Sequence, residues 1–386
     1  MVVVKATSAK EILDSRGEKT ILVSIKTNVG DFSASAPMGK SRGKHEAEPY
    51  KKTISDDIKK IKEFSDYFSK EQIEQFDDLK RIEDTIDGHI GANTTFALES
   101  AILKALAKES GKQVWELIDP EARKFPRLVG NCIGGGAHSK TEGRKPDFQE
   151  FLLIPNTENV EEAFEIMKNG KEEAERLLKI RDKEFHEKKN DENAWTTSLM
   201  DKEVLDLLSE LGIPLGIDAA SSTFFKRKKY LYDNPIFNRT DEEQFFYISN
   251  MIDNFNLVYV EDPFDEDDFK NFSKLHKKFS NSFIVGDDLT TTNYKRVNEA
   301  IKNKSINALI VKPNQIGFLS EVKRVCKLAK DSNIKIVFSH RSGETDENIL
   351  ADLAFGFGAD FFKSGITSKV REVKIKRLIE IQESLK

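Results

Sequence analysis

The chain has few of the residues that would tie it to an export route, a membrane or a nucleic acid. It has only two cysteines, Cys132 and Cys326, too few for a disulfide framework. No apolar run approaches the ~20 residues of a membrane helix, and the opening MVVVKATSAKEI lacks a signal peptide's apolar stretch. A formal net charge of -5 leaves no basic surplus for nucleic acid. We therefore expect a cytoplasmic protein whose partners are small molecules and further copies of itself.

The 386 residues exceed one average domain, because a barrel of about 250 residues would leave room for a second unit of roughly 120. Residues 1–36 alternate apolar and polar with two turn signals, which predicts a three-stranded antiparallel meander. Helical periodicity follows from about residue 51. We predict an α/β protein with an N-terminal α+β domain at 1–122, including a lid loop at 37–50, and a larger domain at 127–386.

Several short apolar segments in the second half each end on ionisable residues. These strand ends are Asp218 in PLGID, Glu261 in LVYVED, Asp287 in FIVGDD, Lys312 in LIVK, His340 and Arg341 in IVFSHRS, and Lys363 in FFK. From Glu261 onward they lie about 25 residues apart, which is the length of a repeated βα unit. Such units close into a (β/α)₈ barrel whose strand ends converge on one face. We therefore expect one site there.

Asp218, Glu261 and Asp287 form an all-oxygen set of the kind that Mg²⁺ prefers. Zinc is disfavoured, because no cysteine or interleaved histidine accompanies them. A single acidic residue at a strand end is usually a loop cap, whereas three in succession favour a metal site. These three carboxylates are therefore predicted metal ligands.

Lys312 and Lys363 end later strands opposite those carboxylates. One of them can act as a base near neutral pH if neighbouring cations, such as Arg341 or Mg²⁺, lower its pKa. The alternative is a lysine that only balances charge.

Two loops carry further candidate ligands for an anion. Arg341 and Ser342 lie where a barrel commonly grips phosphate, and a guanidinium beside a hydroxyl can hold a dianion. The run Gly39-Lys40-Ser41 imitates the end of a P-loop, but Ala34 replaces the required glycine, so an ordinary loop is favoured. His138 follows a run of glycines and precedes Glu150, although neither residue is specific alone.

Taken in order, the segments ILDSRG, GAN, GGGAH, QEF, DE, IDAASS, EDPFDEDD, VGDDLTTTN, VKPNQIG, SHRSGET, ADLA and KSG are similar to the signatures of the enolase family. The similarity spans nearly the whole chain. It implies an enolase-type (β/α)₈ barrel whose opening elements depart from pure βα order. It also implies two Mg²⁺ ions and a hydro-lyase that interconverts 2-phosphoglycerate and phosphoenolpyruvate in glycolysis and gluconeogenesis.

The resemblance also implies a role for each matching residue. Lys312 becomes the base for the C2 proton, and Glu192 the acid for the C3 hydroxyl, assisted by Glu150 and needing a raised pKa. The first metal ion falls to Asp218, Glu261 and Asp287, and the second to Ser41 on the lid loop. The implied contacts with a phosphorylated acid substrate are His138, Glu150, Glu261, Asp287, Ser339, catalytic His340, Arg341, Ser342 and Lys363.

Several positions near these residues depart from the family's usual sequence. The motif DEGGF is DENAW here, so Asn193 and Ala194 replace two glycines. The lid motif SGAST is MGKSR, which adds Lys40 and Arg42. Leu22 replaces an acidic residue often used in the dimer contact, and the C-terminal SERxxKYN is VREVKIK. The last two changes argue against the family's usual homodimer.

Three functions follow from these observations. The first is a working Mg²⁺-dependent enolase, favoured because every mapped catalytic, metal and phosphate position keeps its residue type. The second is an enolase-like lyase for a different phosphorylated or phosphonate-bearing acid, suggested by the changed lid and turn. The third is a non-catalytic binding protein on the same fold, which the intact cluster argues against.

Overall fold

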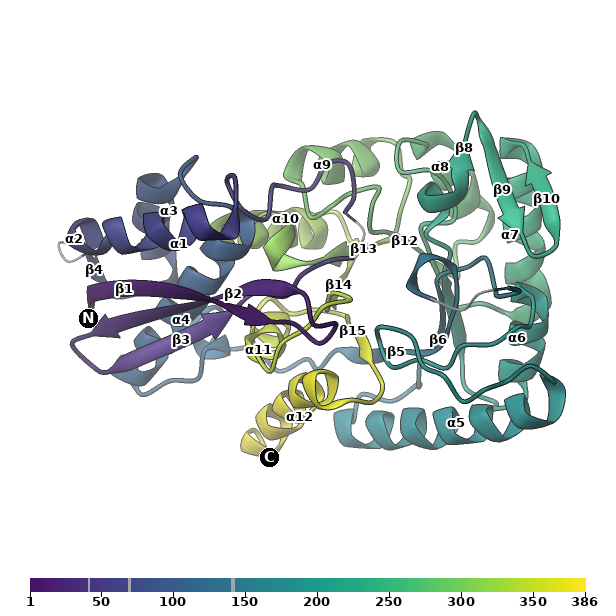
Figure 1. The fold of residues 1–386 in the computed structure, drawn as a ribbon, viewed down its shortest axis with the longest axis horizontal. Coiled ribbons are helices and arrows are strands. Elements are labelled where there is room, and N and C mark those ends of the chain that lie inside the picture. Colours follow the sequence, from purple (N-terminus) through teal and green to yellow (C-terminus); the bar gives the residue numbers. More distant parts are fainter. Residues whose placement is uncertain (41, 69–70, 140–142) are drawn as a thin grey trace.

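The computed structural model describes residues 1–40, 42–68, 71–139 and 143–386, so the predicted ligand Ser41 lies outside it. The chain opens with an antiparallel sheet of strand order β3-β2-β1-β4, drawn in purple in Figure 1. Its strands are β1 (Val2–Leu13), β2 (Lys19–Thr27), β3 (Asp31–Ser35) and β4 (Gln72–Ile73). The predicted meander is therefore confirmed for β1 to β3, which pair in sequence order.

Four helices accompany this sheet: α1 (Ile54–Glu63), α2 (Ser65–Phe68), α3 (Leu79–Ile86) and α4 (Ala92–Ser110). Helix α4 is buried along most of its length, because β2 and β3 cover one side and a segment of the following barrel covers another. It ends at Gly111, whose positive φ of 68° makes the left-handed C-cap that glycine adopts without strain.

The remainder closes into a barrel of strand order β11-β12-β13-β14-β15-β5-β6-β7, which confirms the predicted fold class. The strands are β5 (Arg127–Gly134), β6 (Glu150–Leu153), β7 (Leu215–Asp218), β11 (Tyr259–Glu261), β12 (Phe283–Gly286), β13 (Ala308–Val311), β14 (Lys335–Ser339) and β15 (Phe361–Gly365). Strand β6 runs antiparallel to both its neighbours, while the other pairs are parallel. Because β6 is reversed, its first residue, Glu150, lies beside Asp218, the last residue of β7.

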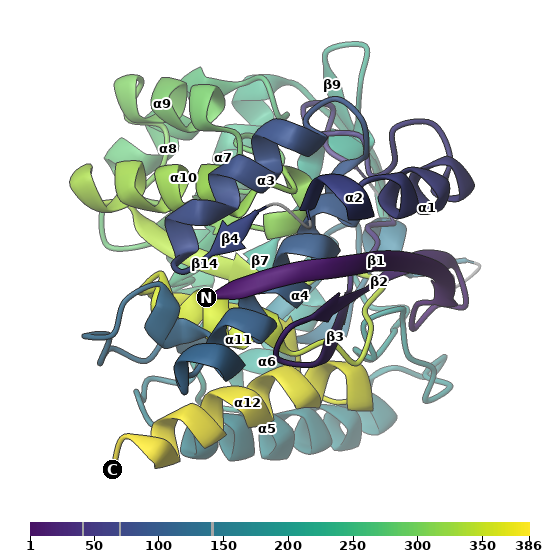
Figure 2. The same ribbon diagram turned by 90° about the vertical axis from the view of Figure 1, so that its left-hand side faces the viewer.

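Helices cover the outside of the barrel, and α5 and α12 run side by side in both views (Figures 1 and 2). They are α5 (Val160–Arg181), α6 (Asp201–Ser209), α7 (Asp241–Phe255), α8 (Phe269–Lys278), α9 (Tyr294–Lys302), α10 (Leu319–Asp331), α11 (Ile349–Gly356) and α12 (Lys369–Ser384). A small antiparallel sheet joins β8 (Phe225–Lys226), β9 (Lys229–Asp233) and β10 (Ile236–Arg239). Every helix in the described part of the chain is too short or too polar to cross a bilayer.

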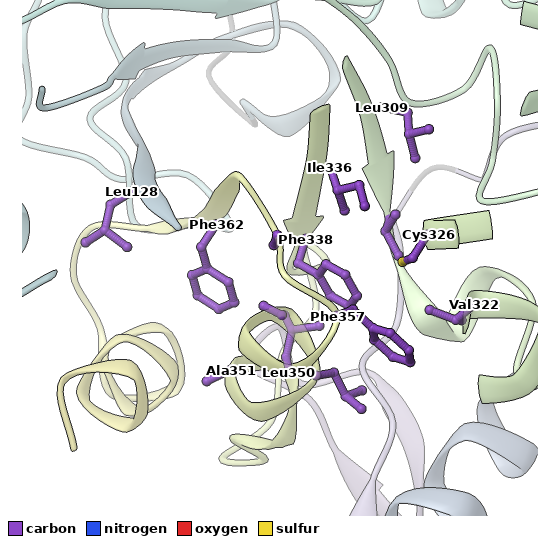
Figure 3. Close-up of a cluster of buried hydrophobic side chains, with 14 of the residues drawn as sticks. Leu128, Leu309, Val322, Cys326, Ile336, Phe338, Leu350, Ala351, Phe357 and Phe362 are labelled. Atoms are coloured by element: carbon purple, nitrogen blue, oxygen red, sulfur yellow. The ribbon is translucent and has the colours of Figure 1, made fainter. Parts of the chain in front are cut away.

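Alternate residues of each barrel strand face opposite sides, as the strand period requires. Ala308 and Ile310 of β13 belong to the cluster that fills the barrel interior, whereas Leu309 packs toward the helices. Figure 3 shows that helix-facing layer, where Phe338 stacks on Phe357 with ring centroids 6.0 Å apart. Cys326 lies in the same layer, and burial raises the pKa of its thiol to about 12. The filled interior leaves the mouth of the barrel as the place for chemistry.

Candidate active site

The strand ends converge, as predicted, on one polar cavity at the mouth of the barrel. The predicted residues that line it are His138, Glu150, Glu192, Asp218, Asp287, Lys312, Ser339, His340, Arg341, Ser342 and Lys363. Glu261 is fully buried, and its carboxylate forms an ion pair with Lys363 of this group. Lys40 and Glu46 of the lid loop also line the cavity, although the sequence patterns did not assign them a role. The described residues of the predicted site are thus brought together.

Lys363 lies at the centre of the buried carboxylates. Its Nζ is 2.8 Å from both oxygens of Glu261, 3.0 Å from Asp218 Oδ2 and 3.1 Å from Glu150 Oε2. Burial disfavours the charge on Lys363, but the three carboxylates outweigh burial and raise the pKa of this lysine well above its usual range. Lys363 is therefore a cation that neutralises part of the acidic cluster.

The carboxyl groups of the acidic cluster still crowd one another in spite of Lys363. Burial and the neighbouring Asp218 raise the pKa of Glu261 to about 8. Tyr259 on the same strand donates a hydrogen bond to Glu261 Oε2 over 2.7 Å, which fixes that carboxylate. Buried hard oxygen ligands that crowd one another fit a divalent cation such as Mg²⁺, which would relieve their repulsion. Asp218, Glu261 and Asp287 are the residues that would hold it.

Asp287 also belongs to a second group of carboxylates. Single oxygens of Asp262, Asp287 and Asp288 lie within 4.8 Å of one another, so these three residues could also hold a metal ion. Asp262 accepts hydrogen bonds from the backbone N–H groups of Asp287 (3.0 Å) and Asp288 (2.7 Å). It thereby shapes the turn that directs Asp287 into the cavity. Burial and Asp287 raise the pKa of Asp288 to about 8.

The predicted base, Lys312, donates a hydrogen bond from Nζ to Asp287 Oδ2. Burial, Arg341 and Lys363 lower the pKa of Lys312, but the carboxylate of Asp287 outweighs them and leaves that pKa raised. The lowered pKa that a lysine base would need is therefore not present in this arrangement, because an ion pair with Asp287 offsets the neighbouring cations. Lys312 can accept a proton only after Asp287 takes another partner.

A second group lies near Glu192, on the loop after α5. His138, Glu150 and Glu192 each place a ligand atom within 4.8 Å of the others. Glu192 Oε1 is 3.7 Å from His138 Nδ1 and 3.6 Å from His340 Nε2. Asn131 Nδ2 donates to the other oxygen of Glu192 over 3.0 Å. Two carboxyl groups and two imidazoles therefore share one small volume.

The two carboxyl groups have opposite proton affinities. Burial opposes the charge on Glu192, but His340, His138 and Arg371 hold the pKa of its carboxyl well below the usual range. Burial and Glu192 raise the pKa of Glu150 well above its usual range. The expected raised pKa of Glu192 is therefore wrong, because its neighbours favour the ionised form. Within the pair, a proton is therefore held more readily by Glu150 than by Glu192.

The lid loop makes direct contacts with the residues expected to hold phosphate. Glu46 Oε2 is 3.0 Å from Arg341 Nη1, and both side chains are 5% exposed. The backbone N–H of Lys40 donates to Ser342 Oγ over 2.8 Å, and Lys40 Nζ pairs with Asp191 at 2.8 Å. The described part of the loop therefore lies against the cavity in this structure.

Comparison with known proteins agrees with this architecture. Residues 4–118 match the family described as "Enolase, N-terminal domain", and residues 123–386 match "Enolase, C-terminal TIM barrel domain". The chain belongs to the enolase family. The resemblance expected from the sequence is confirmed.

Curated relatives named enolase align with almost the whole chain. The Pyrobaculum aerophilum protein is 34% identical over 97% of this chain and 95% of its own length. The Methanosphaera stadtmanae protein is 35% identical over 99% of this chain and 97% of its own, and that of Methanocorpusculum labreanum is 35% identical over 97% of both. Family membership therefore covers both parts of the fold.

The turn that replaces the enolase family's DEGGF motif is supported by local contacts. Asn193 has a positive φ of 66°, a conformation that asparagine tolerates better than most residues. Its Nδ2 donates to Thr367 Oγ1 over 2.6 Å, and Lys171 donates to its carbonyl oxygen. Asn190 Oδ1 accepts from the N–H groups of Glu192 and Ala194, each over 2.9 Å. The turn therefore keeps Glu192 in the cavity without the two glycines.

The C-terminal segment VREVKIK, which keeps the arginine and the lysine of SERxxKYN at the same spacing, places two buried cations in α12 that sequence reasoning missed. Arg371 is 0% and Lys374 1% exposed. Lys374 Nζ pairs with Glu344 at 2.7 Å, beside the turn that bears Arg341. Their three-residue spacing, continued by Ile375 and Leu378, is the signal that could have placed them on the buried face of a helix.

Proposed function

We propose that this chain catalyses the reversible dehydration of 2-phosphoglycerate to phosphoenolpyruvate. The observation that carries the proposal is one cavity in which Lys312 lies beside Asp287, and in which Glu150, whose pKa is raised by burial, lies beside Glu192. Dehydration needs a base for a carbon-bound proton and an acid for a departing hydroxyl, and these two groups supply both. The family and its curated relatives support the same reaction.

In the proposed first half of the reaction, Lys312 takes the C2 proton. Its ammonium is paired with Asp287, so that pair must loosen before the neutral amine can form. A cation held by Asp218, Glu261 and Asp287 would draw Asp287 away from Lys312. When bound, Mg²⁺ supplies positive charge that lowers the energy of the enolate. Two ions per site are part of the proposal, with Ser41 as a ligand of the second.

In the proposed second half, the C3 hydroxyl leaves with a proton from the Glu150–Glu192 pair. The residue adjacent to the hydroxyl is Glu192, as the family resemblance implies, and Glu150 is the store that keeps the shared proton. Burial lowers the pKa of the imidazoles of His138 and His340, which favours the neutral form of each ring over the charged form. Neutral imidazoles beside Glu192 can donate hydrogen bonds to the substrate without competing for the proton.

The remaining polar residues position the substrate in this proposal. Lys363 lies close to Lys312's side of the cavity and pairs with the substrate carboxylate. Arg341 and Ser342 hold the phosphate, for which Arg341 exchanges its partner Glu46. Ser339 lines the same wall.

The test is direct. Purified protein with 2-phosphoglycerate and Mg²⁺ should develop the ultraviolet absorbance of phosphoenolpyruvate, and chelation should abolish it. No absorbance at any Mg²⁺ concentration would refute the proposed reaction. Lys327→Ala serves as a matched control for Lys312→Ala. Lys327 lies on α10, and its side chain is 75% exposed and pairs at the surface with Asp331.

One observation favours a second candidate, an enolase-like lyase for another phosphorylated or phosphonate-bearing acid. Lys40 adds a cation to the cavity wall where the family's lid motif has none. Such a charge favours a more acidic substrate. Competition between 2-phosphoglycerate and a panel of such acids separates the two candidates, because the preferred substrate has the highest kcat/KM. The division into units 1–122 and 127–386 remains a proposal, as does a possible homodimer, against which Leu22 and the changed C-terminal segment argue.

A further inference from the structure

Helix α12 buries an arginine directly behind the active site. Arg371 is 0% exposed, and among the described residues it is the largest side chain that is fully buried. Its guanidinium donates hydrogen bonds to Nδ1 of His340 and to the carbonyl oxygen of Arg341. It also donates to the carbonyl oxygens of Ser342 over 2.6 Å and Asp191 over 3.4 Å. Each of these acceptors is an uncharged group.

A buried cation whose hydrogen-bond acceptors are all uncharged is expensive even with the carboxylate of Glu192 nearby, so its retention needs a physical reason. The positions of the acceptors indicate that reason, because the acceptors belong to two separate segments of the site. His340, Arg341 and Ser342 follow β14, whereas Asp191 precedes the acid Glu192. One planar guanidinium therefore ties the phosphate-binding turn to the loop of the acid.

The contact with His340 also fixes the position of a proton. A guanidinium has donors and no acceptor, so Nδ1 of His340 must be the acceptor. The proton of the neutral ring then lies on Nε2, which is 3.6 Å from Glu192 Oε1 and faces the cavity. The opposite tautomer would place two N–H donors against each other at Arg371.

The backbone of β15 leaves room for this arrangement. A Cβ at Gly365 would lie 3.1 Å from Arg371 Cγ and 2.8 Å from the carbonyl oxygen of Glu192. Contacts this short are tighter than those of ordinary side chains, so a side chain at Gly365 would displace either group. Helix α12, β15 and the loop of Glu192 are thus packed around the guanidinium.

We propose that Arg371 is a positioning residue that sets the Nε2–H tautomer of His340 and clamps the turn of Arg341 and Ser342 against the loop of Glu192. The kinetic part of this inference rests on the proposed function, whereas the tautomer does not. Arg371 lies in VREVKIK, where it and Lys374 keep the spacing of the arginine and the lysine in the family's SERxxKYN pattern.

Nitrogen NMR of the histidine side chains tests the tautomer without any turnover. In protein labelled with ¹⁵N-histidine, and with His340→Gln to assign the signal, His340 should carry its proton on Nε2 between pH 6 and 8. The charged groups that face the ring are Arg371 and Lys374 of α12, Glu192 and Lys363. Loss of the guanidinium in Arg371→Met should let the ring mix tautomers or become protonated. A proton on Nδ1 in the unaltered protein overturns the proposal.

Kinetics test the clamp. Arg371→Met should lower kcat/KM by roughly 10–100-fold, as for other residues that orient a catalytic group. Arg371→Lys keeps the charge and should restore part of kcat/KM while leaving KM raised, because one ammonium cannot reach every acceptor of the planar fork. Arg377→Met is the matched control on the same helix. Arg377 Nε lies 2.8 Å from Asp352 Oδ2, and this ion pair is not part of the cavity. This variant should leave the His340 signals and KM unchanged.

Each outcome bears on the clamp. Equal kinetics and equal His340 signals in Arg371→Met and the unaltered protein refute it. If Arg371→Met fails to fold, the unaltered protein's His340 spectrum and Arg371→Lys still decide the matter. If the unaltered protein forms no phosphoenolpyruvate, the proposed function fails while the NMR result stands by itself.

Discussion

Replacement of Lys363 by methionine tests the electrostatics of the barrel mouth. Methionine fills similar space without a charge, and the change leaves Glu150, Asp218 and Glu261 buried without their shared ammonium. Removal of one partner from a buried ion pair typically costs 3–5 kcal/mol. At about 2.1 cal/mol/K per residue, the unfolding entropy of 386 residues is about 0.8 kcal/mol/K. The cost then corresponds to a fall of about 4–6 °C in Tm.

The assay is thermal unfolding of Lys363→Met and the unaltered protein, each in chelator and in excess Mg²⁺. The gap in Tm should be widest in chelator at pH 9. It should narrow in Mg²⁺, which binds only the folded carboxylate set. It should also narrow as pH falls toward 7, because the pKa of Glu261 is about 8 and a protonated Glu261 loses less when the ammonium is removed. Lys327→Met, which removes an exposed pair, should shift Tm little. Equal Tm values in chelator, or a gap that widens with Mg²⁺, would refute the reasoning.

Three further predictions concern Glu99, Lys40 and Asn193. Burial and the adjacent Glu83 raise the pKa of Glu99 well above its usual range. The protonated carboxyl therefore makes its full contribution to the free energy of unfolding at acid pH, and this contribution is lost as pH rises. Glu99→Gln should therefore raise Tm more at pH 8 than at pH 5. Lys40→Ala removes the pair with Asp191 and should raise KM more than it lowers kcat, measured by initial rates. Asn193→Ala should lower the free energy of unfolding, measured in urea, by about 1–2 kcal/mol. Asn193→Gly should lower it less, because glycine adopts the positive φ of position 193 freely.

The strand ends could be predicted from the sequence because their logic is local. Each apolar segment that ends in Asp218, Glu261, Asp287 or Lys312 is a buried strand followed by a turn, and the repeat length indicates one barrel. Parallel strands then bring those ends together without any knowledge of side-chain contacts.

The remaining features depend on contacts across the chain. The reversal of β6, which brings Glu150 to the mouth, has no local signal, and the family resemblance implied only that the opening elements depart from pure βα order. The raised pKa of Lys312 arises from its pair with Asp287, and the lowered pKa of Glu192 from residues on three other elements. Arg371 was missed because its spacing marks a buried helix face but not the His340 ring that it contacts.

The central claim is that Lys312 handles the C2 proton while the Glu150–Glu192 pair handles the C3 hydroxyl. Exchange of the C2 proton of 2-phosphoglycerate with D₂O, followed by NMR in the presence of Mg²⁺, tests this division most directly. We expect Glu192→Gln to keep exchanging the C2 proton while it forms little phosphoenolpyruvate, and we expect Lys312→Ala to do neither. Exchange by Lys312→Ala at the rate of the unaltered protein would contradict the account.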